Sequence, residues 1–156
     1  MVIFNKYMKL SSSAFENGST IPRKYGYKHG NISPPLTIED VPKHTKTLVL
    51  IMDDPDAVGA VGKVWTHWIV WNISPETTNI PENTLPDNSY QGKTDFEEIR
   101  YGGPAPPDKE HTYVFRLFAL DKKLDNQVGS VKEDIISSML KFVISETKLT
   151  GKYSPQ

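Results

Sequence analysis

The sequence lacks cysteine, a strong charge of either sign and any long apolar run. Without cysteine, disulfides, thiolate nucleophiles and thiolate metal ligands are excluded. The formal net charge is -1, and because no basic stripe is present to neutralise phosphates, nucleic acid is not an expected partner. No apolar run approaches the roughly 20 residues of a membrane-spanning helix, and residues 1–10 lack the apolar core of a signal peptide. We therefore expect a cytoplasmic protein without a transmembrane segment.

Proline and glycine, by contrast, are spread along the whole chain. Twelve prolines and ten glycines divide it into many short segments, which is typical of an all-β fold. No linker, internal repeat or low-complexity block separates two regions. We therefore expect residues 1–156 to form a single, mainly β domain.

Three segments have the composition of strands. Residues 47–52, TLVLIM, form a continuous apolar run, which suits a central strand covered on both sides. Residues 64–72, VWTHWIVWN, and 111–120, HTYVFRLFAL, are rich in aromatic and β-branched side chains.

Alternation along these strands assigns each side chain to a face of the sheet. Strict alternation places His67 with Ile69 and Trp71. The same rule places His111 with Tyr113. Both histidines are therefore expected on apolar faces, near the start of their strands.

One helix is indicated in the C-terminal region. Ser130 and Glu133 have the spacing of a capping box, the segment 134–149 continues the helix, and Gly151 supplies a stop. We expect this helix to cover an edge or a face of the sheet. Its apolar stripe, at helical spacing, consists of Val131, Ile135, Met139, Phe142 and Val143.

Three carboxylates, Asp53, Asp54 and Asp56, directly follow the apolar run. A solvated turn would account for such a cluster. The preceding strand is apolar, however, and burial of a charge costs free energy unless an oppositely charged or hydrogen-bonding partner compensates for it. The two histidines offer such partners, since a nearby carboxylate favours a protonated imidazole. Protonated imidazoles could then donate charge-assisted hydrogen bonds to an anion. Carboxylates close to both histidines could thus keep them protonated.

The loop at residues 100–113, RYGGPAPPDKEHTY, is stiffened by prolines. Between residues 104 and 107 the one backbone donor is the N–H of Ala105. A rigid loop with one isolated N–H could form the wall of an anion pocket, or it could be a simple connector. By contrast, GAVG at 59–62 is read as a flexible loop, and no Gly-x-Ser-x-Gly elbow marks a nucleophile.

Four segments resemble the phosphatidylethanolamine-binding protein family, which includes the Raf kinase inhibitor protein, and in particular its short bacterial and archaeal branch. Two of them match linked family signatures: LIMDDPDAV followed by a strand with a histidine, and YGGPAPPDKEHTYVF. The N-terminal block SSSAFENGSTIPRKYGYKHGNISPPL and the closing LTGKY are similar to the same branch. The resemblance therefore covers nearly the whole chain.

The resemblance implies an antiparallel β-sandwich with few helices and a non-catalytic pocket for phosphate-like anions or phospholipid head groups. A regulatory role toward a kinase or a protease belongs to the same expectation, and no cofactor is expected. Asp54, His67, His111 and Tyr113 would form the pocket, and Asp56 would support its loop. The remaining wall residues implied by the resemblance are Ala105, through its N–H, Pro106 and Pro107.

The sequence departs from the family pattern at three positions. Val58 replaces a proline, so we expect a trans bond between Ala57 and Val58. Thr112 replaces an arginine, which removes a bidentate cation beside the loop. Lys109 replaces a common glycine and returns a positive charge. These changes bear on ligand preference more than on the fold.

Two other functions use the same residues. Asp54, His67 and His111 could be the acid–base groups of a hydrolase, although no nucleophile is evident. Two histidines and a carboxylate could also bind a metal ion. Metal ligation needs neutral imidazoles, whereas donation to an anion needs protonated ones.

Overall fold

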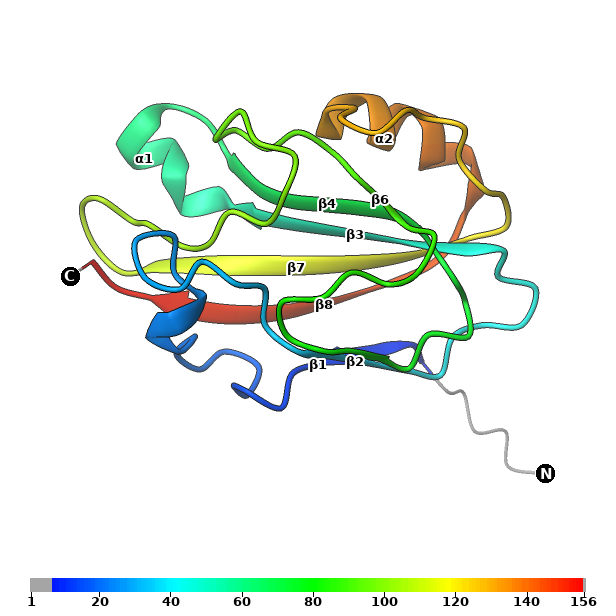
Figure 1. Ribbon diagram of the computed structural model, residues 1–156, viewed down its shortest axis with the longest axis horizontal. Coiled ribbons are helices and arrows are strands. Elements are labelled where there is room, and N and C mark those ends of the chain that lie inside the picture. Colours follow the sequence, from blue (N-terminus) through cyan, green and yellow to red (C-terminus); the bar gives the residue numbers. More distant parts are fainter. Residues whose placement is uncertain (1–6, 156) are drawn as a thin grey trace.

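The computed structural model describes residues 7–155, and its strands form two antiparallel sheets. The smaller sheet has the strand order β1-β2-β5 and the larger the order β6-β4-β3-β7-β8 (Figure 1). The smaller sheet comprises β1 (Lys9–Ser11), β2 (Leu36–Glu39) and β5 (Asn79–Ile80). The larger comprises β3 (Thr47–Asp54), β4 (Trp65–Ile73), β6 (Tyr90–Gln91), β7 (His111–Leu120) and β8 (Val143–Tyr153). The helices are α1 (Val58–Val61), α2 (Lys132–Met139) and the 3-10 turns Arg23–Tyr25, Pro55–Ala57 and Leu140–Phe142.

The three predicted strands are confirmed as the middle of the larger sheet. β3 occupies the centre, between β4 and β7, and every residue from Thr47 to Met52 is buried. Such burial is possible because apolar layers cover both faces of the strand. A continuous apolar run is the pattern that this environment requires.

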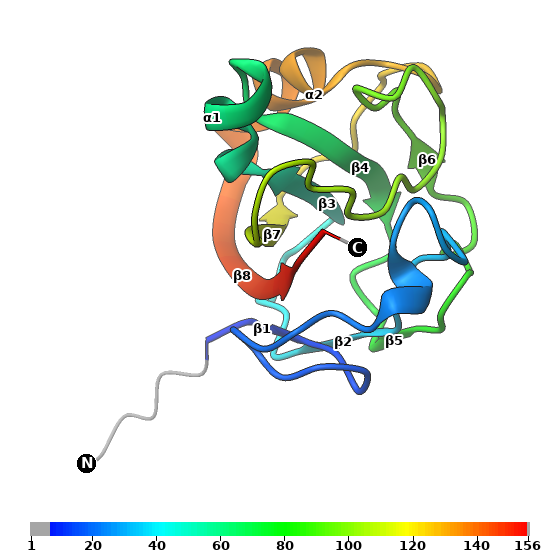
Figure 2. The same ribbon diagram turned by 90° about the vertical axis from the view of Figure 1, so that its left-hand side faces the viewer.

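Two apolar cores flank the larger sheet. Figure 2 shows the layers that enclose them, with α2 on one side of the larger sheet and β1, β2 and β5 on the other. One core lies between the sheets and contains Leu50, Met52 and Phe115. The other lies beneath α2 and contains Ile51 and Ile135. The prediction that the helix covers a sheet face is therefore confirmed, and the chain forms the expected mainly β sandwich.

The predicted helix is shorter than expected. α2 ends at Met139, a 3-10 turn follows, and β8 then runs from Val143 to Tyr153 beside β7. From Val143 onward, side chains alternate between more exposed and more buried, so pairing with the edge of β7 prevails over helical spacing. The expected stop, Gly151, lies in this strand, where a Cβ would come within 2.5 Å of Ile21.

The predicted capping box is also wrong. The cap position of α2 is Val131, which makes no side-chain capping bond. The hydroxyl of Ser130 instead donates to the carbonyl of Gln127 at 2.6 Å. The Ser130 hydroxyl is therefore engaged in a local turn and does not cap the helix, as a capping box would require.

The segment GAVG is not a flexible loop. Gly59 to Val61 lie in α1, which follows the 3-10 turn of Pro55–Ala57 and ends at Gly62, with φ of 81°. All described peptide bonds are trans, including Ala57–Val58 as predicted. Within residues 7–155, no helix is both long and apolar enough to cross a membrane.

A β-bulge in β4 overturns the predicted face of His67. Met52 pairs with Trp68 and Asp53 with Thr66, which leaves His67 as the extra residue. Ile69 and Trp71 belong to the core under α2, but His67 turns to the other face, where its ring packs against Tyr113. An inserted residue shifts the alternation by one position.

Candidate functional site

A cavity of about 140 Å³ lies where β3 ends and β7 begins. α1 and the loop that precedes β7 lie at this end of the sheet, on the left in Figure 1. Residues 54, 67, 111 and 113, far apart in the chain, all line this one cavity. Its polar lining residues are Asp54, His67, His111 and Tyr113.

His111 is held between two carboxylates. Its Nδ1 lies 2.6 Å from Oδ2 of Asp54 and its Nε2 lies 2.7 Å from Oδ1 of Asp108. Burial alone would lower the pKa of His111, but the two carboxylates outweigh burial and raise it above 6.5. The protonated imidazolium donates a charge-assisted hydrogen bond on each side. Both ring nitrogens of His111 are therefore occupied by the protein itself.

His67 is oriented differently from the prediction. Its Nδ1 lies 2.7 Å from the carbonyl oxygen of Gly102, not beside an acid. Burial lowers the pKa of His67, because hydrogen bonds and the carboxylate of Asp54 do not offset its desolvation. A neutral ring that donates from Nδ1 to Gly102 carries a lone pair on Nε2. The two shifts therefore favour a protonated ring at His111 and a neutral ring at His67, whereas the sequence led us to expect two protonated imidazoles.

Two buried polar atoms in the wall have no hydrogen-bond partner among the described residues. They are the hydroxyl of Tyr113 and Oδ1 of Asp54. Burial, together with the nearby carboxylate of Asp54, raises the pKa of Tyr113 well above its ordinary value, so the hydroxyl keeps its proton. Most buried polar atoms are paired, and each exception needs an explanation. The Asp54 carboxylate and the Ala105 N–H lie close enough to the Tyr113 hydroxyl to shift its pKa, but neither forms a hydrogen bond of good geometry with it. A ligand could therefore take up both the donor and the acceptor.

The loop before β7 forms part of the wall, as predicted, but not through every predicted residue. Ala105 and Pro107 line the cavity, whereas Pro106 does not. Pro106 lines a separate cavity of about 160 Å³ beside Tyr153. Ala105 and Pro107 line both cavities, so this part of the loop forms a wall between them, and Pro106 faces only the second one.

Other contacts fix the ends of this loop. The side chain of Asn31 accepts a hydrogen bond from the N–H of Gly103 at 2.7 Å. Asp56 does not line the cavity, but its carboxylate accepts from the N–H of Thr112 at 2.8 Å. This contact fits the expected supporting role of Asp56. The N–H of Ala105 donates to no backbone carbonyl among the described residues.

The sequence motifs do not indicate the apolar wall of the cavity. α1 contributes Ala60 and Val61, and Phe96 closes another side. The ring of Phe96 stacks on Tyr27 with centroids 4.1 Å apart and meets His67 edge-on at 5.3 Å. No spacing rule links these positions, because they come together only in the folded chain.

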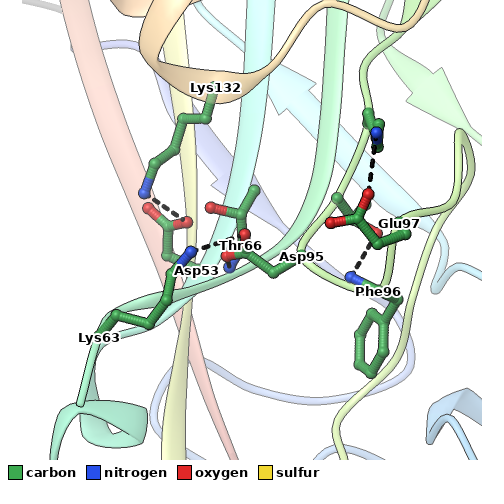
Figure 3. A network of polar contacts seen from close by, with 9 residues as sticks. Asp53, Lys63, Thr66, Asp95, Phe96, Glu97 and Lys132 are labelled. Carbon is green, nitrogen blue, oxygen red and sulfur yellow. Dashed lines mark hydrogen bonds and ion pairs between the residues drawn. The ribbon is translucent and has the colours of Figure 1, made fainter. Parts of the chain in front are cut away.

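Asp95 fixes the segment that carries Phe96, as Figure 3 shows. One carboxylate oxygen accepts from Lys63 at 2.8 Å and the other from the N–H of Thr66 at 2.7 Å. Close by, Lys132 of α2 donates to Asp53 at 3.1 Å. Asp53 thus faces α2 and not the cavity. Among the described residues, no group of three or more His, Cys, Asp or Glu is arranged to hold a metal ion.

The family of the chain is shown by comparison. The model of the phosphatidylethanolamine-binding protein family matches residues 11–154. The chain therefore belongs to this family, and the resemblance inferred from the two signatures is confirmed.

Relatives of nearly the same length occur in archaea and bacteria. A UPF0098 protein of Methanothermobacter thermautotrophicus is 46% identical over 151 residues, covering 94% of this chain and 98% of the relative. A UPF0098 protein of Chlamydia trachomatis is 41% identical over 148 residues, with the same coverage of 94% and 98%. Neither name states an activity.

Solved structures share the fold. A putative phosphatidylethanolamine-binding protein homologue from Chlamydia trachomatis superposes with a TM-score of 0.91 at 39% identity, covering 97% of this chain and 100% of that one. E. coli YbcL, described as a member of the mammalian family, has a TM-score of 0.89 at 28% identity, with coverage of 97% and 100%. The antiparallel sandwich is thus the fold of the family.

Proposed function

We propose that the protein is a non-catalytic ligand-binding protein whose cavity takes a small phosphate-like anion, either free or as the head group of a phospholipid. The observation that carries this proposal is the pair of buried, unpartnered atoms in the wall, the Tyr113 hydroxyl and Asp54 Oδ1. Left unpaired, such atoms cost free energy. A ligand that pairs both would recover that cost on binding.

The chemistry of the wall favours a phosphate that keeps a proton. The Tyr113 hydroxyl can donate to a phosphoryl oxygen, whereas Asp54 Oδ1 and Nε2 of neutral His67 can only accept. The imidazolium of His111 supplies the positive charge. A singly charged phosphate or phosphomonoester has both kinds of oxygen, protonated and bare. The site therefore suits this form better than an anion without hydroxyl groups. A phosphodiester, as in most phospholipid head groups, has no such proton, so its donor would have to be another group, such as the ammonium of an ethanolamine.

The size of the cavity supports a head group and not a whole lipid. Its volume of about 140 Å³ is below the roughly 300–1,000 Å³ of pockets for drug-sized ligands. The remainder of a larger ligand would lie outside, against the apolar residues at the mouth. Val61 of α1, which lines the cavity, is 52% exposed.

The hydrolase alternative has less support. No serine, threonine or lysine is among the residues that line the cavity, so the described part of the chain offers no hydroxyl or amine nucleophile there apart from Tyr113, and burial raises the pKa of Tyr113. A regulated kinase or protease would meet the same site through a phosphorylated segment. A phosphopeptide is accordingly one ligand to test.

Isothermal titration calorimetry with inorganic phosphate and with sulfate tests this proposal. The two anions have similar shape, but sulfate has no proton to donate near neutral pH. We expect phosphate to bind at least about tenfold more tightly than sulfate. Bound sulfate would leave the buried acceptor Asp54 Oδ1 without a donor, which costs free energy on the order of one charged hydrogen bond. Phosphoethanolamine and a phosphopeptide, titrated in the same way, distinguish a lipid head group from a protein segment.

Variants assign the binding to this cavity. Tyr113→Phe removes the unpartnered donor and is expected to weaken phosphate binding by about tenfold. Tyr90→Phe is the matched control, since Tyr90 is 42% exposed on β6 and should leave the affinity unchanged. Equal affinity in all three proteins, or turnover of a phosphoester that His111→Gln abolishes, would count against the proposal.

A further inference from the structure

Asp108 joins the exposed loop to the buried histidine. It lies among four consecutive exposed residues, 107–110. Its carboxylate nevertheless accepts from Nε2 of His111 at 2.7 Å, while 42% of its side chain remains in contact with solvent. His111 itself has no exposed side-chain surface. The contact therefore lies at the boundary between solvent and the cavity.

The two carboxylates on His111 are not equivalent. Asp54 is only 3% exposed and stands in the sheet, so it cannot leave Nδ1 without unfolding the end of β3. Asp108 can turn into solvent by rotation of its own side chain. Nε2 is consequently the one ring nitrogen of His111 that a ligand can reach, and Asp108 occupies it.

We propose that Asp108 is an internal competitor for the anion site, a carboxylate that occupies the Nε2–H of His111 until a ligand anion displaces it into solvent. This inference rests on the proposed function, because it concerns the same cavity. Asp108 would thus lower the affinity of the site for anions, although it is not one of the residues that line the cavity.

Charge supports the competition. With Asp108 in place, two carboxylates face one imidazolium, so the group carries an excess negative charge and repels an incoming anion. With Asp108 in solvent, Asp54 and His111 balance each other and the Nε2–H is free. Neighbouring Lys109 and Glu110 are exposed, and Glu110 accepts from the hydroxyl of Ser154 at 3.1 Å, away from His111.

Calorimetric titration with inorganic phosphate at about pH 6 tests the competition, since His111 is protonated there. Asp108→Ala is expected to bind phosphate about tenfold more tightly than the unmodified protein, and Asp108→Asn to fall between them, because a neutral amide is a weaker competitor. Glu110→Gln is the matched control. It removes one negative charge from the same loop without touching His111, and its affinity should change by less than about twofold.

The outcomes separate this inference from the function on which it rests. If Asp108→Ala binds like the unmodified protein while His111→Gln weakens binding, the cavity binds anions but Asp108 does not compete. If Asp108→Ala and Glu110→Gln tighten binding equally, the effect is general charge and the inference is wrong. If no protein in the series binds phosphate, the proposed function fails and the inference fails with it. A fall in the NMR-measured pKa of His111 in Asp108→Ala verifies that the contact exists in solution.

Discussion

Asp54 and His111 lie 57 residues apart in the sequence and form a buried pair with 2.6 Å between Oδ2 and Nδ1. Since neither side chain has more than 4% of its surface exposed, water screens this pair only weakly. The pair ties the end of β3 to the start of β7 at the cavity. It is therefore both a structural link and the charged part of the candidate site.

Removal of the Asp54 charge should lower both stability and the pKa of His111. Asp54→Asn leaves the imidazolium with one carboxylate, and loss of one partner of a buried pair costs about 3 kcal/mol of unfolding free energy. Urea unfolding and ¹H–¹³C NMR titration of His111 measure the two effects. The neighbouring Asp53→Asn is the control, because its partner Lys132 belongs to α2, and the pKa of His111 should stay near its original value there.

Stability should depend on pH through His111. Its pKa in the folded protein is raised above the ordinary 6.5, so its stabilisation is complete below 6.5 and is lost as pH rises through the folded-state pKa. Unfolding free energies measured by urea denaturation should fall over that range, and His111→Gln should remove this fall. His67, whose pKa is lowered from 6.5, acts in the opposite sense, and its contribution is lost as pH decreases below 6.5. A profile that His111→Gln leaves unaltered would contradict the assignment.

The hydroxyl of Tyr113 should be dispensable for folding. Because this buried hydroxyl has no partner, Tyr113→Phe removes an unsatisfied group and should change the unfolding free energy by less than about 1 kcal/mol, or raise it. Tyr101→Phe is the contrasting variant, since its hydroxyl donates to the carbonyl of Tyr25 at 2.9 Å. Thermal and urea unfolding compare the two. A large loss of stability in Tyr113→Phe would mean that the hydroxyl is paired in the free protein.

Close packing of the loop before β7 should depend on Gly103. A Cβ at this position would overlap the carbonyl oxygen of Tyr25 and lie 2.9 Å from the carbonyl carbon of Gly26, both of them backbone atoms. Gly103→Ala should therefore cost about 2 kcal/mol or more, because backbone cannot yield as a side chain can. Gly59→Ala in α1 meets nothing within 4 Å and should be neutral or slightly stabilising. Equal unfolding free energies for the two variants would show that the loop is not packed as described.

The strands and the meeting of the site residues could be predicted, because their signals are local and strong. The apolar run at 47–52 and the aromatic strand at 111–120 became β3 and β7. The two linked signatures then indicated that Asp54, His67 and His111 share a cavity. The strand patterns depend on composition and spacing alone, whereas the shared cavity was implied by the family resemblance.

The remaining features depend on tertiary context. The face of His67 follows from a bulge, and a bulge has no reliable sequence signal when no glycine marks it. The predicted helix does not continue beyond Met139, because the segment from Val143 pairs with the edge of β7 and forms β8. Asp108 went unnoticed because an acid in an exposed loop is usually solvated. Its position three residues before His111 was the available signal.

A crystal structure of the protein with inorganic phosphate tests the central claim most directly. The account predicts tetrahedral density in the cavity, within hydrogen-bond distance of the Tyr113 hydroxyl and of Nε2 of His111, with the carboxylate of Asp108 turned to solvent. An empty cavity at saturating phosphate, with Asp108 still on His111, would contradict it.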